Sequence, residues 1–256
     1  MGVLAAERIK FTSTKSPWWC SAIIVVLGLG FASILGWAAQ LATETDAPEG
    51  IPPTTAADVV GLGVGTFGSM VLMILAALTV TSEYRFGLIR TTFQAVTNRG
   101  SVLAAKALLV GVYGAILSFV LAVIGLYLAK ALAGEQAGAL LGFDIDGTWR
   151  VLYGTAILAF VQVVLAIGVG ALMRQSAGAI AILLLWPLLI ENLVGVIPTV
   201  GEKIQPFLPF LNANHFLGSS GGVDFHWGPI GGLIYFVAFT AVIFGAAVFV
   251  VNRRDA

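Results

Sequence analysis

The feature of this sequence that most restricts its fold is a series of long apolar segments with very few charged residues. A helix needs about 20 apolar residues to cross the hydrocarbon core of a bilayer. Because lipid offers no hydrogen-bond partner to an exposed backbone, such segments must be helical. The sequence therefore predicts an all-α integral membrane protein, built as one transmembrane domain over residues 1–256. Its six transmembrane helices are expected at residues 17–42, 58–81, 103–130, 150–173, 176–197 and 228–251.

Composition supports this fold class and excludes several others. The chain is 59% hydrophobic and only 10% charged, which leaves too little polar surface to cover a soluble protein of 256 residues. Its single cysteine, Cys20, excludes an intramolecular disulfide and a cysteine-based metal cluster. The first apolar segment follows several charged residues and lacks a small-residue cleavage site, so we interpret it as a retained helix.

The basic residues are distributed unevenly between the two sides of the predicted bundle. Loops with an excess of Lys and Arg remain in the cytoplasm. An even number of spans puts both termini on one side, and that side holds most of the 13 basic residues, so both termini are predicted to be cytoplasmic. The residues on this side are Arg8, Lys10, Lys15, Arg85, Arg90, Arg99, Lys106, Arg174, Arg253 and Arg254.

The segment 81–106, between the second and third spans, mixes apolar and basic residues. On a helix, the apolar side chains share one face, whereas Arg85, Arg90 and Gln94 lie elsewhere. Two interpretations are open: a solvated loop with an interfacial anchor, or an interfacial helix on which another protein acts. The apolar face consists of Tyr84, Leu88, Ile89, Thr92, Phe93 and Val96.

Glu191 and the adjacent Asn192 interrupt the fifth apolar segment. An ionisable group at membrane depth is costly and usually faces an interior or an aqueous cavity. Two roles are therefore expected for Glu191. It either caps a helix or pairs with another group near the outer interface, with Lys203 as one candidate for an ion-pair partner, or it lines a substrate exit path together with Asn192. Farther along the chain, apolar residues in the Pro-containing connection 198–227 predict short external helices that dip back into the outer leaflet.

Other motifs are interpreted as structural. Stripes of small residues at four-residue spacing, Gly28 to Gly36 and Gly61 to Ser69, predict close helix packing. The sequence Gly63-x-Gly65-x-x-Gly68 belongs to the same helix and lacks the strand that a dinucleotide site requires. No Walker A sequence is present, so any ATP must be hydrolysed by another chain.

The pattern Glu83-Tyr84-Arg85-x-Gly87-x-Ile89-Arg90-Thr91-Thr92, followed by Asn98-Arg99-Gly100 and Lys106, resembles the membrane permease subunits of bacterial type-2 ABC exporters, especially the actinobacterial branch. The resemblance extends over nearly the whole chain. It includes a charged entry segment from Glu7 to Lys15 and Trp18-Trp19 at the start of the first span.

This resemblance implies a coupling helix that docks on a separate ATP-binding subunit and an amphipathic connecting helix at the N-terminus. Two permease copies, identical or paralogous, would assemble with two ATP-binding subunits in the bacterial cytoplasmic membrane. ATP and Mg would be bound by the partner, with no cofactor, metal or catalytic residue in this chain and no nucleic acid partner. The implied coupling residues are Glu83, Tyr84, Arg85, Phe86, Leu88, Arg90 and Phe93, and the connecting helix contains Glu7, Arg8 and Lys10.

The nearly uncharged helices favour an amphipathic, drug-like or lipid-like substrate over a sugar or an ion, because a polar substrate needs hydrogen-bonding groups at depth. Two alternatives belong to other classes. Gly218-x-Ser220-Gly221 resembles the nucleophile motif of rhomboid intramembrane proteases, with Ser220 as the nucleophile and His226 nearby. A secondary transporter is the third possibility, although Glu191 stands alone where such proteins usually carry several ionisable groups.

Overall fold

The computed structural model describes residues 2–44, 54–88, 99–197, 200–219 and 222–253, and all regular secondary structure in these ranges is helical. Within these described ranges, six helical spans are long and apolar enough to cross a membrane: Ser16–Thr43, Ala56–Arg85, Arg99–Leu132, Thr148–Met173, Ser176–Val196 and Pro229–Arg253. The all-α fold and the six spans that the sequence predicts are thereby confirmed, and they fit a multi-pass membrane protein.

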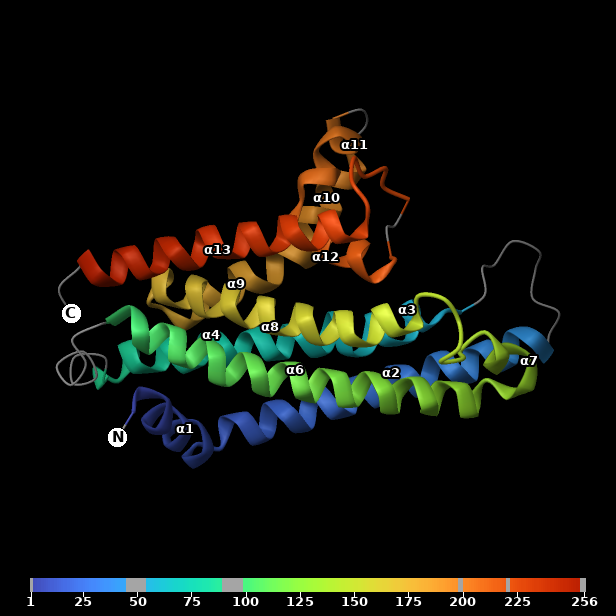
Figure 1. Ribbon diagram of the computed structural model, residues 1–256, viewed down its shortest axis with the longest axis horizontal. Coiled ribbons are helices and arrows are strands. Elements are labelled where there is room, and N and C mark those ends of the chain that lie inside the picture. Colours follow the sequence, from blue (N-terminus) through green and yellow to red (C-terminus); the bar gives the residue numbers. More distant parts are fainter. Residues whose placement is uncertain (1, 45–53, 89–98, 198–199, 220–221, 254–256) are drawn as a thin grey trace.

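The described helices follow one another in this order (Figure 1): α1 Val3–Ser13, α2 Ser16–Glu44, α3 Ala56–Val60, η1 Gly61–Gly68, α4 Ser69–Arg85, α6 Arg99–Leu132, α7 Gly134–Ala139, α8 Thr148–Met173, α9 Ser176–Leu185, η2 Trp186–Ile190, α10 Glu191–Val196, α11 Val200–Ile204, η3 Gln205–Phe207, α12 Pro209–Leu217 and α13 Pro229–Arg253. The segments η1 and η2 are π-helical turns within longer spans, and η3 is a 3₁₀ turn.

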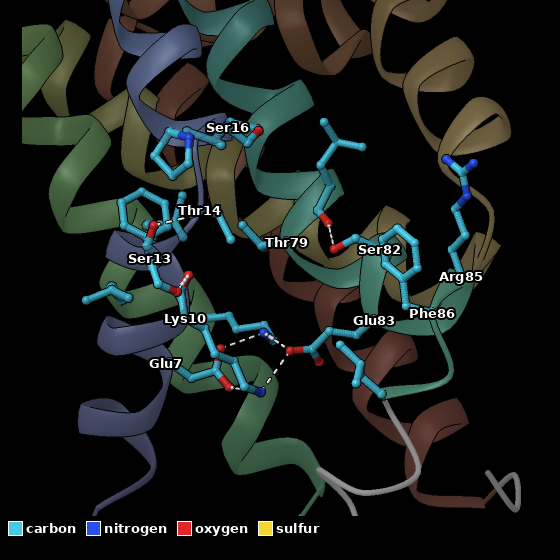
Figure 2. A pocket seen from close by; sticks show the side chains of 18 of the residues that line it. Glu7, Lys10, Ser13, Thr14, Ser16, Thr79, Ser82, Glu83, Arg85 and Phe86 are labelled. Atoms are coloured by element: carbon cyan, nitrogen blue, oxygen red, sulfur yellow. Dashed lines mark hydrogen bonds and ion pairs between the residues drawn. The ribbon is translucent and has the colours of Figure 1, made fainter.

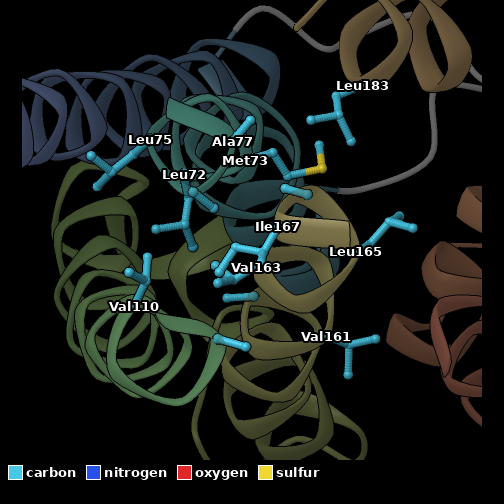
Figure 3. Packing of buried hydrophobic residues seen from close by; sticks show 14 of the residues in the cluster. Leu72, Met73, Leu75, Ala77, Val110, Val161, Val163, Leu165, Ile167 and Leu183 are labelled. Atoms are coloured by element: carbon cyan, nitrogen blue, oxygen red, sulfur yellow. The ribbon is translucent and has the colours of Figure 1, made fainter. Parts of the chain in front are cut away.

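Two spans form the centre of the bundle and are the most buried of the six: α8, and the span Ala56–Arg85, which consists of α3, η1 and α4. Helix α8 packs against α4, α6 and α13. Figure 3 shows how Leu72 of α4, Val110 of α6, and Val163 and Ile167 of α8 fill the space between α4, α6 and α8. The main hydrophobic core therefore lies between α4, α6 and α8.

Small residues allow α2 to approach its neighbours closely, as the stripe in the first span predicts. A side chain at Gly36 would place its Cβ 2.5 Å from the carbonyl oxygen of Ala129, and one at Gly63 would place it 2.9 Å from that of Gly28. The predicted stripe in the second span is wrong at Gly61, which has no neighbour within 4 Å. Residues 61–68 form a π-helix, whose wider turn changes which residues share a face, so Gly63 makes this contact instead.

Helix α1, the last turn of α4 and the first turns of α6 meet at one end of the bundle, here called the α1 end (Figure 1). The C-terminal end of α13 also lies at the α1 end. Phe11 of α1 packs edge-on against Tyr113 of α6, with ring centroids 5.2 Å apart. This packing places the charged residues of α1 beside the ends of two spanning helices.

The segment after the second span differs from the prediction. Helix α4 continues to Arg85, so Glu83 and Tyr84 belong to the last turn of a spanning helix and not to a separate helix. Arg85 is followed by a turn in which Gly87 has a φ of 71°, a conformation that glycine adopts without strain. Phe86 and Leu88 are the last described residues of the predicted coupling helix, whereas Arg90 and Phe93 lie outside the described residues.

The connection between α10 and α13 contains the short helices α11 and α12. Helix α12 packs against α13 and α8, and its Phe210 and Phe216 are buried in the main hydrophobic core. The apolar residues that the sequence places in this connection therefore serve to attach it to the bundle.

Candidate functional site

Four charged side chains from three helices form an ion cluster at the α1 end (Figure 2). The Nζ atom of Lys106 lies 2.5 Å from Oε2 of Glu7 and 2.8 Å from Oε1 of Glu83. The Nζ atom of Lys10 lies 3.1 Å from Oε1 of Glu7 and 2.9 Å from the same Glu83 oxygen. The cluster therefore joins α1, α4 and α6 through two carboxylates and two ammonium groups.

Three members of the ion cluster are buried. Glu7, Glu83 and Lys106 expose 4%, 6% and 4% of their surfaces, whereas the Lys10 side chain remains 45% exposed. Buried charges are tolerated when they are paired and hydrogen-bonded, and removal of one partner leaves an uncompensated charge. Burial lowers the pKa of Lys10, but hydrogen bonds and charges from Glu83 and Glu7 outweigh this effect and raise its pKa above the usual 10.5. Lys10 is therefore a cation at neutral pH.

Local helix geometry explains how these residues meet. Glu7 and Lys10 are three residues apart on α1, so they share one face. Glu83 lies in the last turn of α4, and Lys106 lies about two turns from the start of α6. The packing of α1 against α6 brings the shared face of α1 to both side chains.

A cavity of about 480 Å³ lies beside the ion cluster. Its volume is in the range of small-molecule sites. Its walls come mainly from α1, α4 and α6, with contributions from the start of α2, the turn after α4 and Ser176 of α9, and most of the wall is apolar. Figure 2 shows the polar side of the cavity, with Lys10 and Glu83 directed toward each other and Ser82, Arg85 and Phe86 along α4 and the turn that follows it.

The structure brings some of the predicted coupling residues together and separates others. Glu83 joins Glu7 and Lys10 of the predicted connecting helix in the ion cluster. Tyr84 is half-buried, and the guanidinium of Arg174 lies 5.2 Å from the centroid of its ring. The exposed residues of these two predicted sets are Arg8, Arg85, Phe86 and Leu88. Arg90 and Phe93 lie outside the described residues.

Glu191 connects the fifth span to α12. Its Oε1 accepts hydrogen bonds from the indole N–H of Trp186 at 3.1 Å and from the backbone N–H of Phe210 at 3.0 Å. Its Oε2 accepts the backbone N–H of Leu211 at 2.8 Å. Since Phe210 and Leu211 belong to the first turn of α12, Glu191 satisfies two N–H groups that have no partner within their own helix.

This geometry fits the structural interpretation of Glu191, with backbone groups in place of the suggested Lys203. Pro187 contributes by interrupting regular α-helical bonding, and residues Trp186–Ile190 form a π-helical turn immediately before Glu191. Asn192 is exposed and its amide donates to the backbone carbonyls of Pro187 and Leu188. The alternative role of Glu191 and Asn192 in an exit path stays a prediction.

Of the two residues considered for a protease, Ser220 lies outside the described residues. His226 packs near the rings of Phe207 and Trp227, at centroid distances of 6.0 and 6.2 Å. These contacts place His226 in an aromatic group beside α13.

The ion cluster and the cavity beside it are not predictable from the sequence alone. Glu7, Lys10, Glu83 and Lys106 each stand out as charged residues near apolar segments, but their pairing spans up to 99 positions of the chain. A signal was present, because Lys106 lies within an apolar segment and therefore requires an anionic partner. Glu7 and Glu83, each at the edge of another span, were the nearest acidic candidates.

In comparisons with protein-family models, curated proteins and solved structures, no match to this chain was found. A functional interpretation of the chain therefore depends on its own residues and their geometry.

Proposed function

We propose that this chain is the membrane-spanning permease subunit of an ATP-driven exporter of the type-2 ABC class. It acts with a second permease copy, identical or paralogous, and with two copies of a separate ATP-binding subunit that binds ATP and Mg. In this proposal the α1 end faces the cytoplasm of a bacterial cell and both termini are cytoplasmic. The main supporting observation is the ion cluster, because it ties α1 to the ends of the two spans that flank the segment 86–98.

The cluster provides a mechanical reason for this proposal. Glu83 is two residues before Arg85, so a force on the turn after α4 reaches Glu83 directly. Stretching a buried ion pair costs several kcal/mol. Helices α1, α4 and α6 therefore move as one body when a partner pushes on this turn.

The residues beyond the cluster have the chemistry of a docking surface. Phe86 and Leu88 expose 69% and 53% of their surfaces, and the guanidinium of Arg85 lies 5.7 Å from the centroid of the Phe86 ring. Exposed aromatic and arginine side chains are the types that contribute most to protein interfaces. A soluble ATP-binding subunit would bury this pair on docking.

The apolar helices support an amphipathic, drug-like or lipid-like substrate. Large apolar side chains are exposed along α9, α10 and α13, including Leu185, Val196 and Val242. Such a surface suits lipid, a second permease copy or an apolar substrate better than it suits a sugar or an ion. Substrate would enter from the cytoplasm or the inner leaflet and leave on the opposite side.

The test is co-purification of the affinity-tagged chain from its native membrane without crosslinking. We expect a subunit carrying a Walker A sequence to be recovered in equimolar amount, together with ATP hydrolysis. Arg85→Glu combined with Phe86→Ala should reduce occupancy by this subunit about thirtyfold, because loss of an interface anchor costs about 2 kcal/mol. The matched control is Lys203→Glu, a charge reversal at an exposed position in α11, which should leave recovery unchanged. Equal recovery with the double variant would reject the docking surface.

A further inference from the structure

The wall of the 480 Å³ cavity changes in chemistry along α4. At the α1 end the wall carries the ion cluster and Arg85, which belongs to the last turn of α4. Leu75 lies on the same helix about 15 Å away along its axis, at a rise of about 1.5 Å per residue. The apolar residues at this inner end of the cavity are Leu75, Leu78, Leu109 and Val110. A ligand that fits this wall has a polar head group at the α1 end and a hydrocarbon chain that runs along α4.

The charges on the wall are unequal in number. The ion cluster pairs two carboxylates with two ammonium groups, so the cluster as a whole carries no net charge. Arg85 is a third cation on the wall, and in the described part of the chain no carboxylate forms an ion pair with it. Its side chain is exposed, and Figure 2 shows it apart from the cluster. Since arginine keeps its charge at neutral pH, the wall has one positive charge in excess and favours an anion.

The neutral polar groups on the wall do not select the charge of a head group. They are hydroxyl groups, which can rotate to donate or to accept a hydrogen bond. Thr79 and Ser82 donate to backbone carbonyls of α4, and Ser176 of α9 donates to Thr81. The other lining hydroxyl groups are those of Ser13, Thr14 and Ser16. The preference for a charge therefore comes from Arg85.

We propose that this cavity is a binding site for an anionic amphiphile, a molecule with one negatively charged head group and an alkyl chain. The head group is a sulfate, phosphate or carboxylate, and it pairs with the guanidinium of Arg85 at the rim through charge-assisted hydrogen bonds. The chain lies between α4 and α6 and packs against Leu75 and Leu109. A membrane phospholipid and a free detergent-like molecule share this chemistry.

The experiment is photolabelling of the purified chain in phosphatidylcholine nanodiscs. The probe is an alkyl sulfate with a diazirine in its chain, and the labelled residues are mapped by mass spectrometry. Labelling is expressed relative to that of Val242 on the exposed apolar face of α13, so that differences in the amount of probe in the bilayer cancel. We expect preferential labelling of α4 and α6 at Leu75, Leu78 and Leu109.

Three competitors with the same alkyl chain and different head groups test the charge: decyl sulfate, decanol and decyltrimethylammonium. An ion pair at an exposed position contributes up to about fivefold in affinity. We therefore expect decyl sulfate to compete about two- to fivefold better than decanol at equal concentration in the bilayer. Decyltrimethylammonium should compete most weakly.

Three variants assign the binding to the cavity. Arg85→Gln keeps a polar side chain and removes the charge, so decyl sulfate and decanol should then compete equally. Thr79→Trp fills the cavity between its two ends and should abolish the preferential labelling. Arg253→Gln is the matched control, because Arg253 is also exposed and lies over the ring of a nearby phenylalanine but does not line the cavity; the ranking should stay unchanged.

Labelling without a preference for α4 and α6 overturns the proposal, as does competition by decanol or decyltrimethylammonium that equals that of decyl sulfate. A preference for decyl sulfate that survives in Arg85→Gln also overturns it. If Thr79→Trp does not fold, the ranking of the competitors and its loss in Arg85→Gln still decide the question. The assay contains no ATP-binding subunit, so its result is separate from the docking test of Arg85.

Nanodiscs that contain phosphatidylglycerol identify the source of the ligand. Weaker relative labelling of α4 and α6 in these nanodiscs supports a site that a membrane phospholipid fills. Unchanged relative labelling supports a site for a free amphiphile.

Discussion

Lys106 is the member of the ion cluster whose removal should cost most. Replacement of Lys106 by Met keeps an unbranched apolar stem of similar length and deletes the ammonium group. Glu7 then loses the ammonium at 2.5 Å, and both carboxylates depend on Lys10 alone. Two buried carboxylates facing one cation should destabilise the folded chain strongly.

The magnitude follows from burial. Lys106 is 4% exposed, and removal of one partner from a buried ion pair typically costs about 3–5 kcal/mol. The side chain of Lys10 is 45% exposed, so Lys10→Met is discounted for solvent screening and should cost about 1 kcal/mol or less. Two lysines that contact the same carboxylates should thus differ severalfold in their contribution to the free energy of unfolding.

The assay is equilibrium unfolding of the purified chain by SDS in mixed micelles, followed by circular dichroism. Addition of Glu7→Gln to Lys106→Met should recover part of the loss, because it removes the carboxylate that the deleted ammonium had neutralised. If Lys106→Met lowers the free energy of unfolding no more than Lys10→Met does, the ion cluster is not a buried junction and the reasoning fails.

Two further predictions concern stability. Glu191→Gln should destabilise the chain by about 1–3 kcal/mol and increase proteolysis around α12, because an amide cannot accept hydrogen bonds from all three of the present donors. The control is Glu202→Gln at an exposed position, and equal effects of the two variants would refute the capping role of Glu191. Gly36→Ala should cost about 1–3 kcal/mol in the same unfolding assay because its Cβ would overlap Ala129, whereas Gly30→Ala on the same helix meets no neighbour within 4 Å. Equal stability of these two glycine variants would contradict the close approach of α2 and α6.

Much of the fold was predictable because membrane crossing is a local property of the sequence. Each span needs a certain length of apolar residues, and a window of the sequence contains that information. The predictions were less exact at span ends such as Arg85 and Arg99, where polar residues continue the helices beyond the apolar windows. Helices can project into the interfacial region, since their backbone bonds are satisfied internally.

The site was less predictable because its contacts join distant parts of the chain. Glu7, Glu83 and Lys106 share no periodic pattern, and only the packing of α1 beside α4 and α6 brings them together. Glu191 was recognised as unusual for its charge, but two of its three hydrogen-bond donors are backbone groups about 20 residues later. Backbone donors leave no trace in residue type, so the sequence allowed two interpretations of Glu191.

The central claim is that this chain is one part of an ATP-driven assembly, and native mass spectrometry of the complex from its own membrane tests it most directly. The predicted result is an assembly of two permease chains and two ATP-binding subunits, which loses the ATP-binding subunits when Arg85→Glu and Phe86→Ala are combined. A chain that is recovered intact and active without any Walker A subunit would contradict the claim.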